Sequence, residues 1–342
     1  MRHIKILLFL LTGLGIFFVY AFIQQAYIGK VVAGAPIHIQ IEQGLAPEGV
    51  ARLLEKEGII SSAFLYKIYG RFDRAYERPK AGEYDIRSQT SFQAIAKTLA
   101  KGPARREVQI RIIEGWSVND IIDHLQKTEG IDPAVTASLV GQSVNKKSFD
   151  PALRSAFPFL DSLPTERSLE GYLFPDTYRV WADQLPDALI KKQLQEFQSR
   201  FADANISSDV APLKTLDDVV ILASLVQREV RDPQDMRIVA GIFLNRLKAG
   251  MRLQSDATVS YLTGSGNARS TPADLQIDSP YNSYRNAGLP PSPVGNPSED
   301  ALRAVLAPEK TNYYYFLTDQ DGAVLYGRTF EEHQQNRIKA GY

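Results

Sequence analysis

The hydrophobic pattern of the chain begins with a long run that carries no charge. Ile6–Ile23 contains eighteen residues without a charged side chain, directly after Arg2 and Lys5. This length is sufficient for a helix that spans the hydrocarbon core of a bilayer. The alternative is a cleaved signal peptide, but its apolar core is shorter, and no Ala-x-Ala cleavage pattern ends this run. We therefore expect a transmembrane anchor at 6–24.

The charges beside this run predict the orientation of the chain. Basic residues favour the cytoplasmic side of a membrane, and here they precede the span. We expect a cytoplasmic tail at 1–5, a single pass through the membrane, and everything after Gln24 outside the cytoplasm.

After the apolar run, hydrophobic and polar positions repeat one pattern twice. Isoleucines alternate with polar residues at 37–41, and apolar residues alternate in the same way at 108–112. A period of two is typical of a half-buried strand. Each run precedes a glycine turn and then apolar residues at helical spacing, up to Ile60 in the first copy and Ile131 in the second. The copies lie about 71 residues apart, from Ile37 to Val108.

The first copy continues into a larger unit. The pattern predicts a second short helix at 62–69, a returning strand at Gly82–Ile86, and a further helix from Ser91 that stops at Gly102. A strand–helix–helix–strand unit of this size outside the cytoplasm resembles the LysM glycan-binding fold. We expect this LysM-like module at 30–106. The alternative is a small packing domain that only holds the rest of the chain away from the membrane.

The second copy and a connection with short helices are expected at 107–168, where four prolines interrupt the pattern. The strand of this copy is a candidate partner for the first unit. Its helix is a candidate to pack on the part that follows.

A third pattern predicts a buried helix from Thr215 to Glu229. Thr215 and Asp218 resemble a capping box, and Val219–Val226 is apolar except for Ser224. At 100° per residue, Glu229 falls on the same side as Leu222, Leu225 and Val226. Burial among apolar residues raises the pKa of a carboxyl, as a general acid near neutrality requires. A structural ion pair with Arg228, Arg237 or Arg246 is the alternative, and helix geometry leaves both open.

Polar residues gather after the next predicted helix, which ends near Ala249. Gln254 and Asp256 follow it closely, and Tyr281 and Asn282 precede a Pro-Pro loop. Such clustering suits a polar cleft, and tyrosines in rigid loops can stack on sugar faces, although plain surface packing is equally typical of such loops. The candidate substrate-binding residues are Asn245, Gln254, Asp256, Tyr281 and Asn282.

The composition narrows the chemistry. Thirty-nine basic residues balance thirty-nine acidic ones, so a polyanion such as nucleic acid gains no electrostatic attraction. The chain has no cysteine, and its four histidines are scattered, which argues against disulfides, thiolate catalysis and a metal site. We expect no metal and no cofactor.

Several motifs in order resemble the YceG-like family, the endolytic murein transglycosylases. They are Leu169–Tyr178 (LEGYLFPDTY), Ala223–Glu229 (ASLVQRE), Phe243–Leu247 (FLNRL), Met251–Asp256 (MRLQSD) and Gly288–Pro291 (GLPP). With the anchor and the LysM-like module, the resemblance extends from Met1 to about Ala340. It implies that the glutamate closing the Ala-Ser-x-x-x-x-Glu helix, Glu229, is catalytic. The chain departs from a common family form at Gln227, where a second glutamate often stands.

The resemblance also implies the reaction and the location. The expected reaction is cleavage of the β-1,4 bond between N-acetylmuramic acid and N-acetylglucosamine within a nascent strand, leaving a 1,6-anhydro end without consuming water. Glu229 would act first as acid and then as base. The expected location is the bacterial inner (cytoplasmic) membrane, and the expected partners are peptidoglycan glycan strands, the membrane and peptidoglycan synthases.

Two rival functions remain. A muramidase would use Asp256 as a second carboxylate, and a non-catalytic scaffold tethered to the membrane would bind peptidoglycan with Glu229 held in an ion pair. The expected fold class is α+β: an N-terminal transmembrane helix, a LysM-like βααβ module, and a mixed α/β catalytic domain at 169–342 with a buried glutamate-bearing helix. A hairpin is expected at Tyr313–Leu317 and Val324–Gly327.

Overall fold

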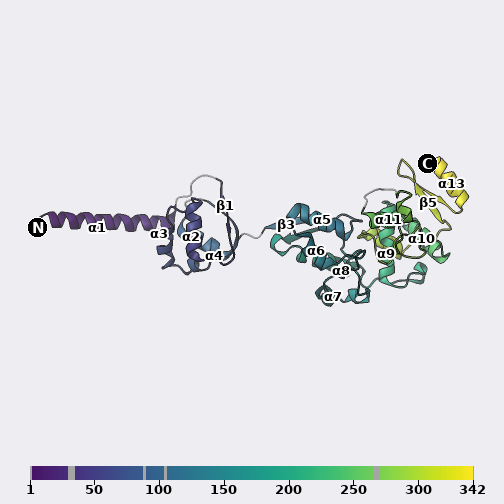
Figure 1. The fold of residues 1–342 in the computed structure, drawn as a ribbon, viewed down its shortest axis with the longest axis horizontal. Helices are drawn as coiled ribbons and strands as arrows, with labels where there is room; N and C mark the ends of the chain where they lie inside the picture. The colour runs from purple at the N-terminus through teal and green to yellow at the C-terminus, as the bar shows by residue number, and fades with distance from the viewer. Residues whose placement is uncertain (1, 30–34, 88–89, 104–105, 265–269, 342) are drawn as a thin grey trace. The chain divides into compact units, whose positions relative to one another are not determined.

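The computed structural model divides the chain into two compact units, Met1–Arg105 and Arg106–Tyr342, which are described separately below (Figure 1). The structure describes residues 2–29, 35–87, 90–103, 106–264 and 270–341. Within the range expected for the first module, residues 30–34, 88–89 and 104–105 therefore lie outside the described residues.

Unit 1 begins with an apolar helix. Helix α1 (Arg2–Ile23) continues into a π-helical turn, η1 (Gln24–Ile28). Among the described residues it is the one helix long and apolar enough to cross a membrane, with a candidate span at Phe9–Ile28. Large apolar side chains are exposed along it, such as Phe9 and Phe17. Such a surface is stable in an apolar environment such as a bilayer, which is typical of a membrane anchor and of a signal sequence.

The rest of unit 1 has the predicted strand–helix–helix–strand order. Its elements are β1 (Ile37–Ile41), α2 (Pro47–Lys56), α3 (Ala63–Gly70), the 3-10 turn η2 (Arg74–Glu77), β2 (Gly82–Ile86) and α4 (Phe92–Lys101). The strands pair antiparallel, with Ile37 opposite Ile86. Alternate residues of both strands are buried, as the period of two predicts. The core also includes Ala26, so the turn after α1 packs on the module.

In unit 2 the second copy is joined to the part that follows it. Strand β3 (Glu107–Arg111) pairs antiparallel with β4 (Thr177–Trp181), so it does not pair with the first unit. Helix α5 (Val118–Glu129) packs against α6 (Pro133–Val140). The connection contains the short helices α7 (Pro151–Ala156) and η3 (Pro158–Ser162), as predicted. The 107–168 segment thus belongs to the same compact unit as 169–342.

A bundle of helices forms the centre of unit 2 (Figure 1). Helix α9 (Leu216–Glu229) packs against α10 (Pro233–Lys248), α11 (Asp256–Thr263) and α12 (Glu299–Leu306). A capping box of Thr215 and Asp218 starts α9, and every residue from Val219 to Val226 is buried. Helix α8 (Asp187–Phe201) and the turns η4 (Ala182–Gln184), η5 (Ser208–Val210) and η6 (Asp274–Gln276) complete this part.

The C-terminal hairpin is present where it was predicted. Strands β5 (Tyr315–Thr318) and β6 (Val324–Gly327) pair antiparallel, and α13 (Phe330–Lys339) follows them and packs on both. The chain is therefore mixed α and β, with an apolar N-terminal helix, as the coarse fold class predicts.

Candidate active site

Glu229 is the last residue of α9, at the point where this buried helix reaches the surface of unit 2. Residues Val219–Val226 of this helix are enclosed by the core, whereas Glu229 itself is only partly buried. Burial raises the pKa of its carboxyl to about 7. The hydrogen bond from the Ser255 hydroxyl lowers this pKa, and the nearby charge of Asp256 raises it. The positive charges of Arg246 and Arg228 also lower the pKa. A carboxyl in this range can both give and accept a proton near neutral pH.

The arginines that could have neutralised Glu229 have other partners. Arg228 donates to the carbonyl of Val294, and Arg237 pairs with Glu309 at 3.8 Å. Arg246 is buried, and its guanidinium donates hydrogen bonds to main-chain carbonyls. Among the described residues, no ion pair joins any of these arginines to Glu229.

Arg246 fixes the segment that carries Ser255. Its Nε donates to the carbonyl of Tyr314 at 2.6 Å, and its Nη1 donates to that of Leu253 at 2.6 Å. Ser255 Oγ donates a hydrogen bond to Glu229 Oε1. The main-chain N–H of Ser255 in turn donates to Ser283 Oγ at 2.9 Å. Buried hydrogen bonds to the main chain of Leu253 and Ser255 thus hold the segment that places the Ser255 hydroxyl against Glu229.

Gln254 and Asp256 flank this serine. Gln254 is exposed and has a φ of 52°, the left-handed region that residues other than glycine rarely adopt. Asp256 begins α11, and its Oδ1 accepts a hydrogen bond from the Tyr284 hydroxyl at 3.1 Å. Two of the sequence-predicted residues are therefore the chain neighbours of the serine that contacts Glu229.

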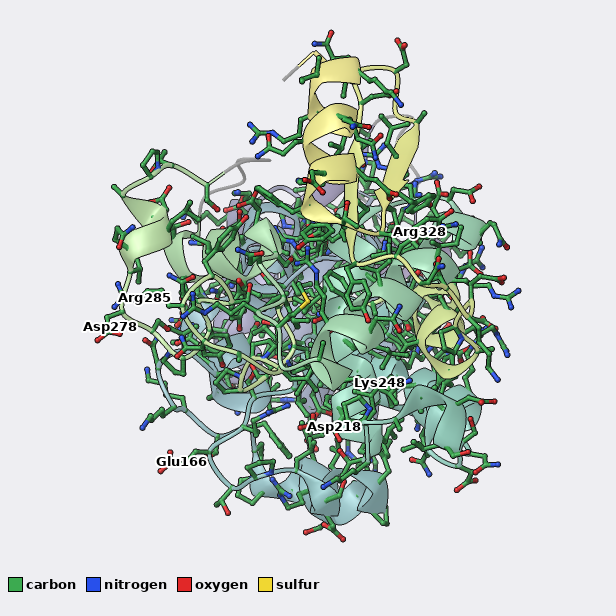
Figure 2. All side chains as sticks on the ribbon, turned by 90° about the vertical axis from the view of Figure 1, so that its right-hand side faces the viewer. Glu166, Asp218, Lys248, Asp278, Arg285 and Arg328 are labelled. Atoms are coloured by element: carbon green, nitrogen blue, oxygen red, sulfur yellow. The ribbon has the colours of Figure 1, made fainter. Side chains whose placement is uncertain are left out.

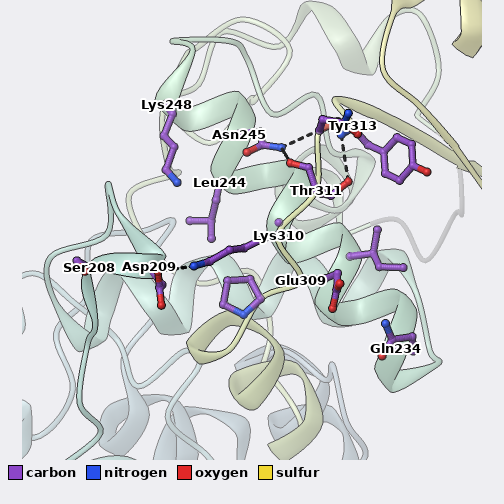
Figure 3. A pocket seen from close by; sticks show the side chains of 14 residues that line it. Ser208, Asp209, Gln234, Leu244, Asn245, Lys248, Glu309, Lys310, Thr311 and Tyr313 are labelled. Atoms are coloured by element: carbon purple, nitrogen blue, oxygen red, sulfur yellow. Dashed lines mark hydrogen bonds and ion pairs between the residues drawn. The ribbon is translucent and has the colours of Figure 1, made fainter.

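The other three predicted residues hold loops in place. Asn245 donates its amide to the carbonyls of Thr311 and Tyr313, at 2.9 and 3.1 Å, and lines a separate cavity of about 830 Å³ (Figure 3). Asn282 is fully buried and donates to two carbonyls of the 275–277 turn. Tyr281 is buried, and its hydroxyl lies 2.6 Å from that of Ser292.

Glu229 lines a cleft whose other wall comes from the second copy. One cavity, of about 550 Å³, contains Glu229, and a second cavity, of about 560 Å³, extends toward the ends of β3 and β4. They share Ile113, Glu114, Gln227 and Arg231, and so lie next to each other. Gln227 accepts the N–H of Ser298 through its amide oxygen at 2.9 Å.

Asn296 connects three segments behind this cleft. It is fully buried, and its Oδ1 accepts the N–H groups of Gly171 and Leu173, both at 2.9 Å. Its Nδ2 donates to the carbonyl of Trp116 at 2.9 Å, and its own main chain bonds with Gly115 and Trp116. A side chain on Gly295 would meet the Gly115 carbonyl oxygen at 2.6 Å, so the two loops approach closely.

A second carboxyl, Glu170, is more deeply buried than Glu229. Its oxygens accept the N–H of Val118 at 3.0 and 3.1 Å and the hydroxyl of Tyr261 at 3.0 Å. Burial raises its pKa to about 8. Its contacts hold the start of α5 against the helical bundle. Sequence reasoning missed this role, because the residues that meet Glu170 lie 52 and 91 positions away along the chain.

The surface of unit 2 carries charges of both signs. Figure 2 labels exposed examples at Glu166, Asp278, Lys248, Arg285 and Arg328. No group of three or more His, Asp or Glu side chains that could hold a metal ion is found within the described ranges.

Comparison with known proteins points to one family. The sequence profile of the YceG-like family matches residues 39–339. A Bacillus subtilis protein named endolytic murein transglycosylase is 30% identical over 312 residues, which cover 89% of this chain and 84% of that protein. A Streptococcus pneumoniae protein of the same name is 30% identical over 322 residues, covering 88% of this chain. The chain spans little more than half of that relative, 57% of its length.

A solved structure agrees with these matches. The crystal structure of a yceG-like protein from Listeria monocytogenes superimposes with a TM-score of 0.56 and is 27% identical in sequence. The match covers 88% of this chain and 98% of that one.

Proposed function

This chain belongs to the YceG-like family, and we propose that it is an endolytic lytic transglycosylase of peptidoglycan in which Glu229 is the catalytic acid and base. The bond cleaved is the β-1,4 link between N-acetylmuramic acid and N-acetylglucosamine within a nascent strand. The product end is 1,6-anhydro-N-acetylmuramic acid. The observation that carries the proposal is the position of Glu229 in a cleft, with its pKa raised to about 7 and no arginine of the described residues paired to it.

The reaction uses one carboxyl group twice, first as acid and then as base. Protonated Glu229 gives its proton to the glycosidic oxygen, which leaves as the 4-hydroxyl of N-acetylglucosamine. The 6-hydroxyl oxygen of the muramyl residue then bonds to C1, and the Glu229 carboxylate takes up the proton of that hydroxyl. One C–O bond breaks, one forms, and no water enters.

The surroundings of Glu229 support both halves of this cycle. Burial and the charge of Asp256 favour the protonated acid, whereas the Ser255 hydroxyl and the charges of Arg246 and Arg228 stabilise the carboxylate. We propose that Gln254 and Asp256 contact the sugar or the positive charge that develops on its ring. The contacts of Asn245, Tyr281 and Asn282 support an indirect part for these three, which is to order the loops around the cleft.

A second candidate function is muramidase-type hydrolysis. It is favoured by one observation, that Asp256 lies close enough to raise the pKa of Glu229. A second carboxylate near the acid is what activation of water requires. The two candidates differ in the end they leave on the strand, a 1,6-anhydro end or a reducing end, which mass spectrometry of the products distinguishes. Failure to release any soluble fragment from purified glycan strands would contradict both.

The pH dependence of cleavage follows from the same contacts. Because the first step needs protonated Glu229, kcat/KM should fall as pH rises through about 7. Ser255→Ala removes a bond that favours the carboxylate, so the pKa of Glu229 should rise and the falling limb should move to higher pH. Ser199→Ala on the exposed face of α8 is the matched control and should leave the profile unchanged. An unchanged limb in Ser255→Ala would show that Glu229 does not control it.

For unit 1 we propose a membrane anchor and a glycan-binding module. The anchor at 6–24 would lie in the inner membrane with the N-terminus in the cytoplasm, because basic residues precede it. The exposed apolar side chains of α1 support this. Removal of residues 1–24 should give a protein that stays in solution after centrifugation and still cleaves strands.

Peptidoglycan synthases are proposed partners, since nascent strands lie beside them, and co-purification after crosslinking in membranes would test this.

The LysM-like interpretation of the module rests on its βααβ order. The experiment is co-sedimentation of a fragment 24–106 with purified sacculi. The fragment starts at 24 because Ala26 and Tyr27 pack against the module. We expect retention in the pellet. A fragment that shows native circular dichroism yet stays wholly in the supernatant would mean that the module is only a spacer.

A further inference from the structure

We propose that the loop between β3 and α5 forms a sugar-binding wall of the active cleft, and that Trp116 is the platform on which a sugar ring of the strand stacks. This inference rests on the proposed function, and it names the residue that binds the substrate. Trp116 lines the same cavity as Glu229. It is partly buried, with its indole ring tilted against the ring of His124 at 5.0 Å between centroids.

The charge of the cleft suits a neutral sugar. Apart from Glu229, the acidic and basic residues of the two adjacent cavities are equal in number: Glu114, Asp120 and Asp176 against Arg111, Arg228 and Arg231. Such a balance suits the uncharged N-acetylglucosamine residues of the strand. An N-acetylated pyranose has apolar C–H faces and hydroxyl edges, which match an indole ring surrounded by charged and amide hydrogen-bonding groups. Each cavity is within the range of about 300–1,000 Å³ that ligand sites occupy.

The main chain of this loop is fixed independently of the Trp116 side chain. Gly115 N–H donates to the carbonyl of Asn296 at 2.8 Å, and the Trp116 carbonyl accepts from both the N–H and the amide of Asn296. Glu170 holds the next turn through the N–H of Val118. A platform held in this way loses little conformational entropy when a ligand binds. A substitution at 116 should also leave the path of the loop unchanged.

The internal repeat supplies the competing explanation. Trp116 precedes Ser117, the N-cap of α5, where an apolar residue commonly staples the start of a helix. The same position of the first copy is Leu45, 71 residues earlier, which packs partly buried against the core of the module. If Trp116 only packs against the start of α5, Trp116→Leu should bind glycan strands as tightly as its parent. Trp116→Leu therefore separates binding from packing.

The chain contains two tryptophans, which makes a direct binding measurement possible. Trp181 lies on β4, is 38% exposed, and does not line either cavity of the cleft. The full chain in detergent carries Glu229→Gln so that the ligand is not cleaved, and it is titrated with N-acetylglucosamine oligomers and with purified glycan strands. With Trp181→Phe added, the fluorescence of Trp116 should change and saturate. With Trp116→Leu added instead, the fluorescence of Trp181 should stay constant.

Affinity is measured on the same proteins by calorimetry. Trp116→Leu should bind glycan strands about tenfold more weakly, which corresponds to about 1.4 kcal/mol of lost stacking. Trp116→Phe keeps an aromatic face and should bind within a few-fold of the parent. Equal affinity of Trp116→Leu and its parent would overturn the inference. An unchanged fluorescence of Trp116 at saturating ligand would also overturn it. If Trp116→Leu unfolds, the fluorescence titration of the Trp181→Phe protein and the affinity of Trp116→Phe still test whether Trp116 contacts the sugar.

Failure of this inference is distinguishable from failure of the proposed function. A wild-type chain that cleaves strands, together with Trp116→Leu that binds them normally, contradicts only the platform. A wild-type chain that binds through Trp116 and cleaves nothing contradicts only the catalytic proposal.

Discussion

Glu229→Gln should retain the fold and abolish strand cleavage. The amide keeps the size of the side chain and can still accept the Ser255 hydroxyl, but it has no proton to give to the glycosidic oxygen. General acid–base catalysis contributes about 10²–10⁴-fold to a rate, and here a single carboxyl serves both steps, so the loss should lie at the upper end or beyond. The measurement is the release of soluble fragments from purified glycan strands.

The matched control for this variant is Glu114→Gln. Glu114 is an exposed carboxylate in the same cleft, so its substitution changes the charge of the cleft without touching the acid. Activity should remain within about tenfold of the wild type, as expected for uniform binding effects. Near wild-type cleavage by Glu229→Gln would remove Glu229 from the reaction, whatever Glu114→Gln does.

Asn296→Ala should destabilise unit 2 by about 3 kcal/mol or more. The substitution leaves the N–H groups of Gly171 and Leu173 and one bond of the Trp116 carbonyl without their side-chain partner. Each buried polar group that loses its partner costs about 1–3 kcal/mol. Denaturant unfolding followed by tryptophan fluorescence is the suitable measurement, because both tryptophans of the chain lie in unit 2.

Asn145→Ala serves as the comparison for Asn296→Ala. Asn145 is exposed, and its amide makes a single bond to Gln142 at 3.2 Å, so its loss should change the free energy of unfolding by about 0.5 kcal/mol or less. Equal small effects of the two substitutions would show that Asn296 does not hold the three segments together.

Local patterns predicted the elements of the fold well. The alternation at 37–41 and at 82–86 has a period of two because one face of each strand is buried, and both strands are present. The capping box at Thr215 and Asp218 and the apolar run after it identified α9. Helices α8, α12 and α13 and strand β4 were missed. In α8 the signal was available in the sequence, because Leu189, Ile190 and Leu194 are buried at helical spacing.

Contacts between distant residues explain the rest of the differences. The partner of β3 is β4, about 70 positions later, and no periodicity within either strand specifies which strand pairs with it. The same limit applies to Glu170 and Asn296, whose main-chain partners lie 52 to 180 residues away. Asn245 has the polar character of a ligand-binding residue, but the loop at 311–313 takes its amide.

The most direct test of the proposed reaction is mass spectrometry of the products formed from purified glycan strands in water enriched in oxygen-18. Intramolecular attack by the muramyl 6-hydroxyl consumes no water, so the new ends should be 1,6-anhydro-N-acetylmuramic acid without the heavy isotope. These ends should be absent from the Glu229→Gln reaction. Reducing N-acetylmuramic acid ends that carry one oxygen-18 atom would contradict the transglycosylase proposal and identify the enzyme as a hydrolase.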